Sequence, residues 1–177
     1  MHRSVLAFIL AGTLLGANVA HAGMGTKVSS RYDPVEAANV AWAGLPTVIL
    51  GQVSAGAGAD SIRALLRAPG WLGAATFESA TSGTSDARLV IVFNPTNAAA
   101  AKRDICRDVA ALGLDQPGSR LVIRAAFCID DKMVTRVTAA ERPLNGPDDP
   151  RLAKLMRRVV EQLFPRTSRT QFDSPGL

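Results

Sequence analysis

Histidine is the side chain that most often moves protons or activates a nucleophile in enzymes, and this chain of 177 residues contains only two. His2 and His21 both lie within the first 22 residues. A Ser-His-Asp or Cys-His site needs an imidazole beside its nucleophile, and a tetrahedral zinc site needs more ligands than two cysteines supply. If these 22 residues are removed, no histidine chemistry remains. We therefore predict no catalytic residue, no metal ligand and no cofactor.

The first 22 residues have the pattern of a secretory signal peptide. Arg3 gives a positive start, Val5–Leu15 is an apolar run, and Ala20-His21-Ala22 fits the small-x-small cleavage pattern. The apolar run is too short and too interrupted for a membrane span of about 20 residues, so cleavage is favoured over an uncleaved anchor. We predict a periplasmic or secreted protein that begins at Gly23 and has no transmembrane span after cleavage.

Carboxylates are the remaining groups for general acid–base catalysis. Asp130-Asp131 falls at a predicted hairpin turn, and Asp148-Asp149 falls at a predicted helix start. Aspartate tolerates tight turns and caps the free N–H groups of helices, which favours structural roles for both pairs. Catalysis would require two acids that face each other in a cleft.

Cys106 and Cys128 are the only cysteines, and their even number in an exported chain predicts a structural disulfide. The spacing lacks the C-x-x-C pattern of a redox pair. On a strand, Cys128 falls on the face opposite Phe127. The disulfide therefore needs either a bulge or strand end near Cys128 or helices that cover both faces of the sheet. The sequence leaves both alternatives open.

Glycines are concentrated between a predicted strand and a predicted helix, at Gly51–Gly58. Phosphate-binding loops occupy such positions, but this segment has no Gly-Lys-Ser/Thr ending and does not fit G-x-G-x-x-G. A flexible connecting loop is favoured over a small anion site at the helix start.

The C-terminal helix carries the clearest surface signal. Its apolar residues recur at i, i+3, i+4 and i+7, which favours packing on a sheet over binding on the surface of an anionic membrane. Its other face is basic and is a candidate partner-binding surface, formed by Arg151, Lys154, Arg157 and Arg158.

The elements alternate in a way that predicts an α+β fold in a single domain. We expect a mixed or largely antiparallel sheet of four to five strands, packed with two to three helices. Asp60 or Ser61 should cap the first helix, Thr96–Leu112 should be the second, and Pro150 should begin the last, which Pro165 stops. Trp71 should cover an edge of the core, and Trp42 should either cover an edge, which is favoured, or form part of a ligand surface. The predicted strands are Leu45–Val53, Ala74–Ser79, Arg88–Phe93, Arg120–Ile129 and Met133–Ala139.

The chain divides into four predicted regions. Residues 1–22 are the signal peptide, 23–44 a loosely ordered entry segment, 45–165 the globular α+β domain and 166–177 a flexible tail. Hydrophobic residues make up 47% of the chain, which suits a folded globule, and aromatic residues only 5%. The net charge of +5 is mild, and nucleic acid is a poor partner outside the cytoplasm.

Three functions remain open. The first is an exported, non-enzymatic binding or envelope-accessory protein, whose partner is a protein, a polysaccharide or an anionic surface. The second is a small hydrolase acting on cell-wall polysaccharide, in which Asp130 or Asp131 works with Glu78 or Glu141. The third is an assembly factor that contacts an anionic partner or membrane through the basic C-terminal helix.

Overall fold

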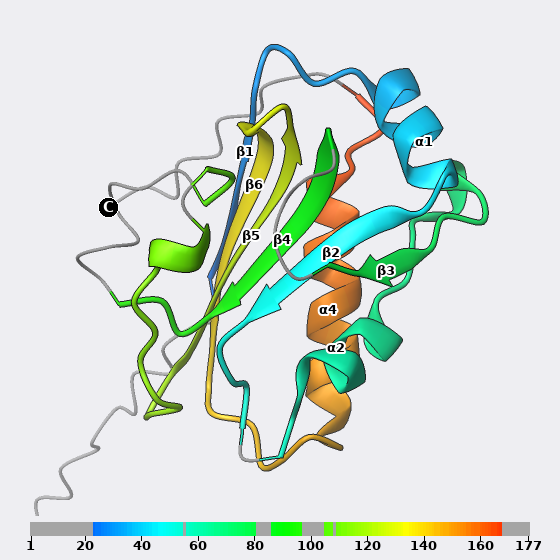
Figure 1. Ribbon diagram of the computed structural model, residues 1–177. Helices are drawn as coiled ribbons and strands as arrows, with labels where there is room; N and C mark the ends of the chain where they lie inside the picture. Colours follow the sequence, from blue (N-terminus) through cyan, green and yellow to red (C-terminus); the bar gives the residue numbers. More distant parts are fainter. Residues whose placement is uncertain (1–22, 55, 81–85, 97–104, 108, 168–177) are drawn as a thin grey trace, which may run out of the picture.

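Six strands of the described residues form one mixed sheet, in the order β1-β6-β5-β4-β2-β3 (Figure 1). The computed structural model describes residues 23–54, 56–80, 86–96, 105–107 and 109–167. Strand β2 is parallel to β3 and β4, whereas the pairs β4–β5, β5–β6 and β6–β1 are antiparallel. The strands are β1 Met24–Val28, β2 Leu45–Leu50, β3 Phe77–Ser79, β4 Ala87–Phe93, β5 Leu121–Ile129 and β6 Lys132–Glu141.

The α+β class is confirmed, but the expected number of strands is wrong, because the sheet has six and not four to five. The additional strand is β1. Residues 23–44, expected to form a loosely ordered entry segment, contain both this strand and helix α1. Strand β1 pairs along its whole length with β6, which lies more than a hundred residues later in the sequence. The local sequence of β1 contains no pattern that predicts this long-range pairing.

Among the described residues, three α-helices pack with the sheet: α1 Pro34–Trp42, α2 Ala59–Leu65 and α4 Pro150–Leu163. Asp33 and Asp149 cap α1 and α4 by accepting the backbone N–H groups of Val35 and Arg151. The predicted cap of α2 is wrong, because the helix begins after Gly58 without a side-chain cap, and Asp60 lies in its first turn. The described residues also include two short 3-10 helices, Gly70–Leu72 (η1) and Val109–Ala111 (η2).

Segments pack on both faces of the sheet, over one face across its width and over the other mainly at β2, β4 and part of β5. The larger core joins α1, α2 and α4 to one face, on which Leu89, Ile91 and Phe127 are fully buried. A smaller core on the other face joins Val90 and Val92 to Ile105, Cys106 and Leu112. This double coverage explains why every residue of β4 is buried. The predicted helix Thr96–Leu112 lies largely outside the described residues, which show η2 in its last part.

The C-terminal end of α4 is fixed by side chains from distant parts of the chain. Thr135 Oγ1 donates to the carbonyl oxygen of Leu163 at 2.7 Å, Trp71 Nε1 to that of Phe164 at 3.1 Å, and the Tyr32 hydroxyl to that of Pro165 at 2.8 Å. Carbonyl groups at a helix end have no partner within the helix, so the bonds to Leu163 and Phe164 satisfy two of them, and the bond to Pro165 holds the chain just beyond the helix. Trp71 thus covers the core edge as predicted.

Trp42 does not cover the core, contrary to the prediction. Its side chain at the end of α1 is 76% exposed.

Candidate functional site

The predicted disulfide lies on the sheet face away from α4. Cys106 and Cys128 are joined with a Cα–Cα distance of 5.6 Å, and both are fully buried. Cys128 belongs to the smaller core, whereas its neighbour Phe127 belongs to the larger one. The structure therefore resolves the geometric question raised by the sequence: segments cover both faces, so Cys106 reaches Cys128 from its own side. A register shift between Phe127 and Cys128 accompanies the bond.

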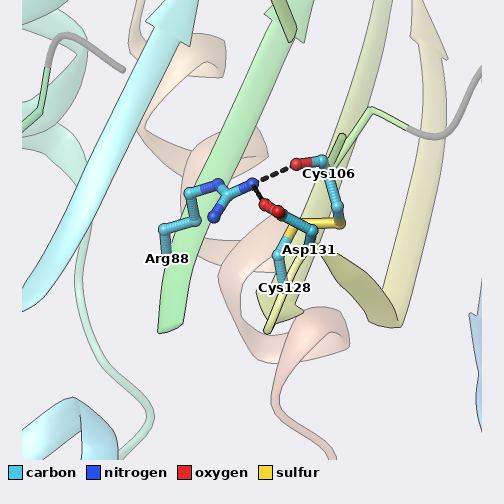
Figure 2. Close-up of a disulfide and its surroundings, with 4 residues drawn as sticks. All are labelled: Arg88, Cys106, Cys128 and Asp131. Atoms are coloured by element: carbon cyan, nitrogen blue, oxygen red, sulfur yellow. Dashed lines mark hydrogen bonds and ion pairs between the residues drawn. A yellow bond between two sulfur atoms is a disulfide. The ribbon is translucent and has the colours of Figure 1, made fainter. Parts of the chain in front are cut away.

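A buried arginine ties this disulfide to the tip of the β5–β6 hairpin. Figure 2 shows the Arg88 guanidinium beside Cys106 and Asp131, where it donates to the Cys106 carbonyl oxygen and pairs with the Asp131 carboxylate. The hydrogen bond from Arg88 and its positive charge lower the pKa of Asp131. Asp130 and Asp131 both adopt left-handed backbone angles, with φ of 48° and 59°, as a tight hairpin connection requires. This pair has the structural role favoured by the sequence.

The structure separates the carboxylates considered for a hydrolase. Glu78 lies on β3, four strand spacings from β6, or about 19 Å. Glu141 ends the ten-residue strand β6, about 30 Å along the strand from Asp131. Glycosidases hold their two acids within about 10 Å of each other. A lowered pKa also keeps Asp131 ionised, which is the opposite of what a general acid needs.

The basic residues of α4 divide into two kinds. Arg151 is engaged, since it pairs with Asp149 at 2.6 Å and donates to the Pro143 carbonyl oxygen at 3.0 Å. The hydrogen bonds from Arg151 and from the Asn145 backbone lower the pKa of Asp149, the helix cap. Lys154, Arg157 and Arg158 are exposed. All four predicted partner-binding residues are therefore exposed, and among the described residues three of them form no ion pair.

The apolar stripe of α4 is buried against the sheet and is not available to a lipid surface. The residues that form it are Leu152, Leu155, Met156, Val159, Val160 and Leu163. In the part of the chain that the structure describes, no helix has the length and apolar character needed to cross a bilayer.

A second group of cations lies on the opposite side of the molecule, on β1, β6 and β5. Lys27 stands directly opposite Arg136 in the β1–β6 register, and Arg136 stands opposite Ala126, two residues from Arg124 on β5. Directly opposed residues, and residues two apart on a strand, point to the same face of a sheet. That face is the one away from α4, because Ala126 packs in the smaller core. We call Lys27, Arg124 and Arg136 the cationic sheet face.

The electrostatics of the cationic sheet face are unfavourable without a counter-charge. Burial lowers the pKa of Arg124, and the positive charge of Arg136 lowers it further. Among the described residues, no carboxylate forms an ion pair with any of the three cations. Like charges at opposed sheet positions destabilise the pairing of strands. The arrangement is therefore a candidate for binding an external anion.

Reasoning from the sequence missed this cluster, because its members are far apart in the chain. Lys27 falls in the segment expected to be loosely ordered, and only the β1–β6–β5 register brings it beside Arg136 and Arg124. A usable signal exists for Arg124 alone, because it is the one polar residue in the otherwise apolar strand β5.

Among the described residues, no group of three or more histidine, cysteine, aspartate or glutamate side chains is placed to hold a metal ion. A scan against protein-family models finds no match, and searches of curated proteins and of solved structures find none either. The candidate site therefore stands on its own geometry.

Proposed function

We propose that this chain is an exported, non-enzymatic binding or envelope-accessory protein that holds an acidic polysaccharide on its cationic sheet face. The observation that carries the proposal is the juxtaposition of Lys27, Arg136 and Arg124 on three adjacent strands without a carboxylate among the described residues to offset them. Neighbouring strands are about 4.8 Å apart, so the cations form a short row that suits repeated negative charges.

A simpler explanation accounts for only one of the three cations. Lysine on an edge strand discourages edge-to-edge pairing of sheets, and Lys27 lies on the edge strand β1. Arg124 lies on β5, an interior strand that pairs with β6 and β4, so this strand has no free edge that a charge could protect. Arg124 and Arg136 are also partly buried, and unpaired charges in such positions need a partner.

The chemistry of the partner follows from what accompanies the charges. Proteins that bind lipid surfaces usually add exposed apolar side chains to their basic residues. Of the described residues, the large hydrophobic side chains that are exposed are Val35, Trp42 and Leu114, none of which lies on β1, β6 or β5. A water-soluble polyanion therefore suits the cationic sheet face better than a membrane does.

Export is supported by the signal-peptide pattern of residues 1–22, which lie outside the described residues, and by the buried disulfide. A mature chain from Gly23 and a tail over 166–177 form part of this proposal, whereas residues 23–44 belong to the folded domain through β1 and α1. Nucleic acid is not proposed as a partner.

A second candidate function is an assembly factor that presents α4 to an anionic partner. The observation that favours it is the exposure of Lys154, Arg157 and Arg158 on one helix. We rank it second because Glu161 lies within one helical turn of both arginines and offsets their charge. The buried apolar stripe limits any such contact to the charged face.

Two variants of equal charge separate the two candidates. In the first, Lys27, Arg124 and Arg136 are changed to glutamine; in the second, Lys154, Arg157 and Arg158 are changed in the same way. Each variant loses three positive charges, but from opposite sides of the molecule. Binding to polygalacturonate, and in parallel to vesicles with anionic lipid, is measured by isothermal titration calorimetry at two salt concentrations.

We expect the protein to bind polygalacturonate in a salt-sensitive way, and the sheet variant to bind about tenfold more weakly. The helix variant should retain most of its affinity. Loss confined to the helix variant would favour the assembly-factor function, and binding to vesicles alone would replace the polysaccharide with a membrane. Equal loss in both variants would show only a general charge effect and would contradict the proposed site.

A further inference from the structure

A crevice lies at the sheet edge where β2, β4 and β6 end and β5 begins. The chain leaves β2 toward α2, on the face that carries α4, and leaves β4 toward residues 105–112, on the other face. Connections that leave adjacent parallel strands toward opposite faces open a gap at the carboxyl ends of those strands. A cavity of about 330 Å³ occupies this edge, which is enough for a small molecule.

Backbone features of the surrounding turns give the crevice its shape. Gly51 has φ of 81°, and a Cβ at this position would collide with the Phe93 carbonyl oxygen, so only glycine lets the two strand ends approach so closely. Asn94, with φ of 48°, donates through Nδ2 to the Gln52 carbonyl oxygen at 2.9 Å and accepts the Val122 backbone N–H at 3.0 Å. The side chain of Asn94 thus joins the exits of β2 and β4 to the start of β5.

The lining of the crevice combines apolar walls with two polar groups that are suited to a ligand. Val53, Leu121 and Leu144 supply apolar surface. The Ser54 hydroxyl oxygen is buried and has no hydrogen-bond partner among the described residues. Arg120 is the one ionisable side chain in the lining. A buried hydroxyl without a hydrogen-bond partner destabilises the folded state, because it has given up its bonds to water. A ligand with an acceptor atom would supply the missing hydrogen bond.

We propose that this crevice binds a carboxylate carried on a short apolar body. A guanidinium presents two parallel N–H donors that match the two oxygens of a carboxylate, and the Ser54 hydroxyl supplies a third donor. A phosphate dianion would leave more negative charge than one arginine offsets, and the three apolar walls would contact its oxygens unfavourably. The carboxylate has two possible sources, a free small acid or the C-terminus of a peptide.

The test uses the purified protein and defined probes. Isovalerate represents the free acid, isovaleramide is its uncharged analogue, and acetyl-Ala-Leu with a free or an amidated C-terminus represents the peptide. Binding is followed by two-dimensional amide NMR and by thermal shift. The variants are Arg120→Gln and Ser54→Ala, and Arg142→Gln is the matched control, because Arg142 is exposed, nearby and absent from the lining.

We expect isovalerate or the free-acid peptide to shift the amide signals of Ser54, Leu121 and Gly146, and isovaleramide and the amidated peptide to shift none. Arg120→Gln should weaken binding about tenfold or more, and Ser54→Ala by a smaller factor, while Arg142→Gln should leave it unchanged. The stronger of the two acid probes identifies the source.

Two outcomes would overturn the proposal: no carboxylate probe shifts these signals, or Arg120→Gln and Arg142→Gln weaken binding equally. Because the crevice shares no residue with the cationic sheet face, failure here leaves the polysaccharide proposal unaffected.

Discussion

Removal of the disulfide should destabilise the fold by an amount that the chain length between the cysteines determines. The bond links residues 22 apart in sequence. In the chain-entropy description, opening a loop of this size costs about 3 kcal/mol of unfolding free energy at 25 °C. For a domain of this size each kcal/mol corresponds to about 2–4 °C, so the variant Cys106→Ala/Cys128→Ala should melt about 6–12 °C below the unchanged protein.

The structure gives two reasons to expect the full effect. Both cysteines are completely buried, so alanine also leaves space in the smaller core. The bond is also the link between residues 105–107 and the sheet, and Arg88 bonds to the carbonyl oxygen of Cys106. The assay is calorimetric melting of both proteins, combined with alkylation of thiols under native and denaturing conditions. A decrease in Tm of less than about 2 °C would refute this reasoning. Alkylation of two thiols in the native protein, taken from the compartment in which it occurs, would also refute it.

Three further predictions concern single side chains. Tyr32 is the only tyrosine, and burial together with the charge of Asp33 raises its pKa, so absorbance at 295 nm should show no ionisation of the folded protein at pH 11. The unfolded chain loses this proton near pH 10, so the free energy of unfolding should fall by about 1.4 kcal/mol per pH unit above that value. The variant Tyr32→Phe should remove this pH dependence. Ionisation of Tyr32 near pH 10 in the folded protein would contradict the prediction. The variant Asn94→Ala loses two hydrogen bonds and keeps a strained φ, so denaturant unfolding should show a decrease of about 2–4 kcal/mol in the free energy of unfolding. Glycine adopts this φ without strain, so Asn94→Gly should lower the free energy of unfolding by about 1 kcal/mol less than Asn94→Ala. Equal decreases for the two variants would exclude backbone strain at this position. Phe164→Ala removes a buried ring with its centroid 5.0 Å from that of Phe127 and should cost about 3–5 kcal/mol in the same assay, whereas a cost below about 1 kcal/mol would show that the ring contributes little.

Elements set by local patterns were predictable from the sequence. The last helix follows from its cap, the proline at its first position and its apolar periodicity, and the structure places it at Pro150–Leu163. The hairpin of β5 and β6 follows from two apolar runs around Asp130-Asp131. The buried position of strand β4 could be predicted because its segment Leu89–Phe93 is apolar at every position.

Features that depend on distant pairing were not predictable. Strand β1 contains Gly25 and exposed Lys27, has no strong strand pattern, and becomes a strand because β6 offers it an edge. The cationic sheet face depends on the register in which β1, β6 and β5 pair. If β6 were shifted by one residue, Arg136 would point to the face that carries α4. The burial of Arg88 was likewise not predictable from the sequence, because its partner Asp131 lies in the turn between β5 and β6.

The central claim, that an acidic polysaccharide lies over β1, β6 and β5, can be observed at the guanidinium groups themselves. Side-chain Nε–Hε NMR signals of the arginines are recorded while polygalacturonate is added to the protein. The account predicts that the signals of Arg124 and Arg136 shift first and saturate together, while those of Arg157 and Arg158 on α4 move little. Shifts confined to Arg157 and Arg158, or no shift at Arg124 at saturating polymer, would contradict it.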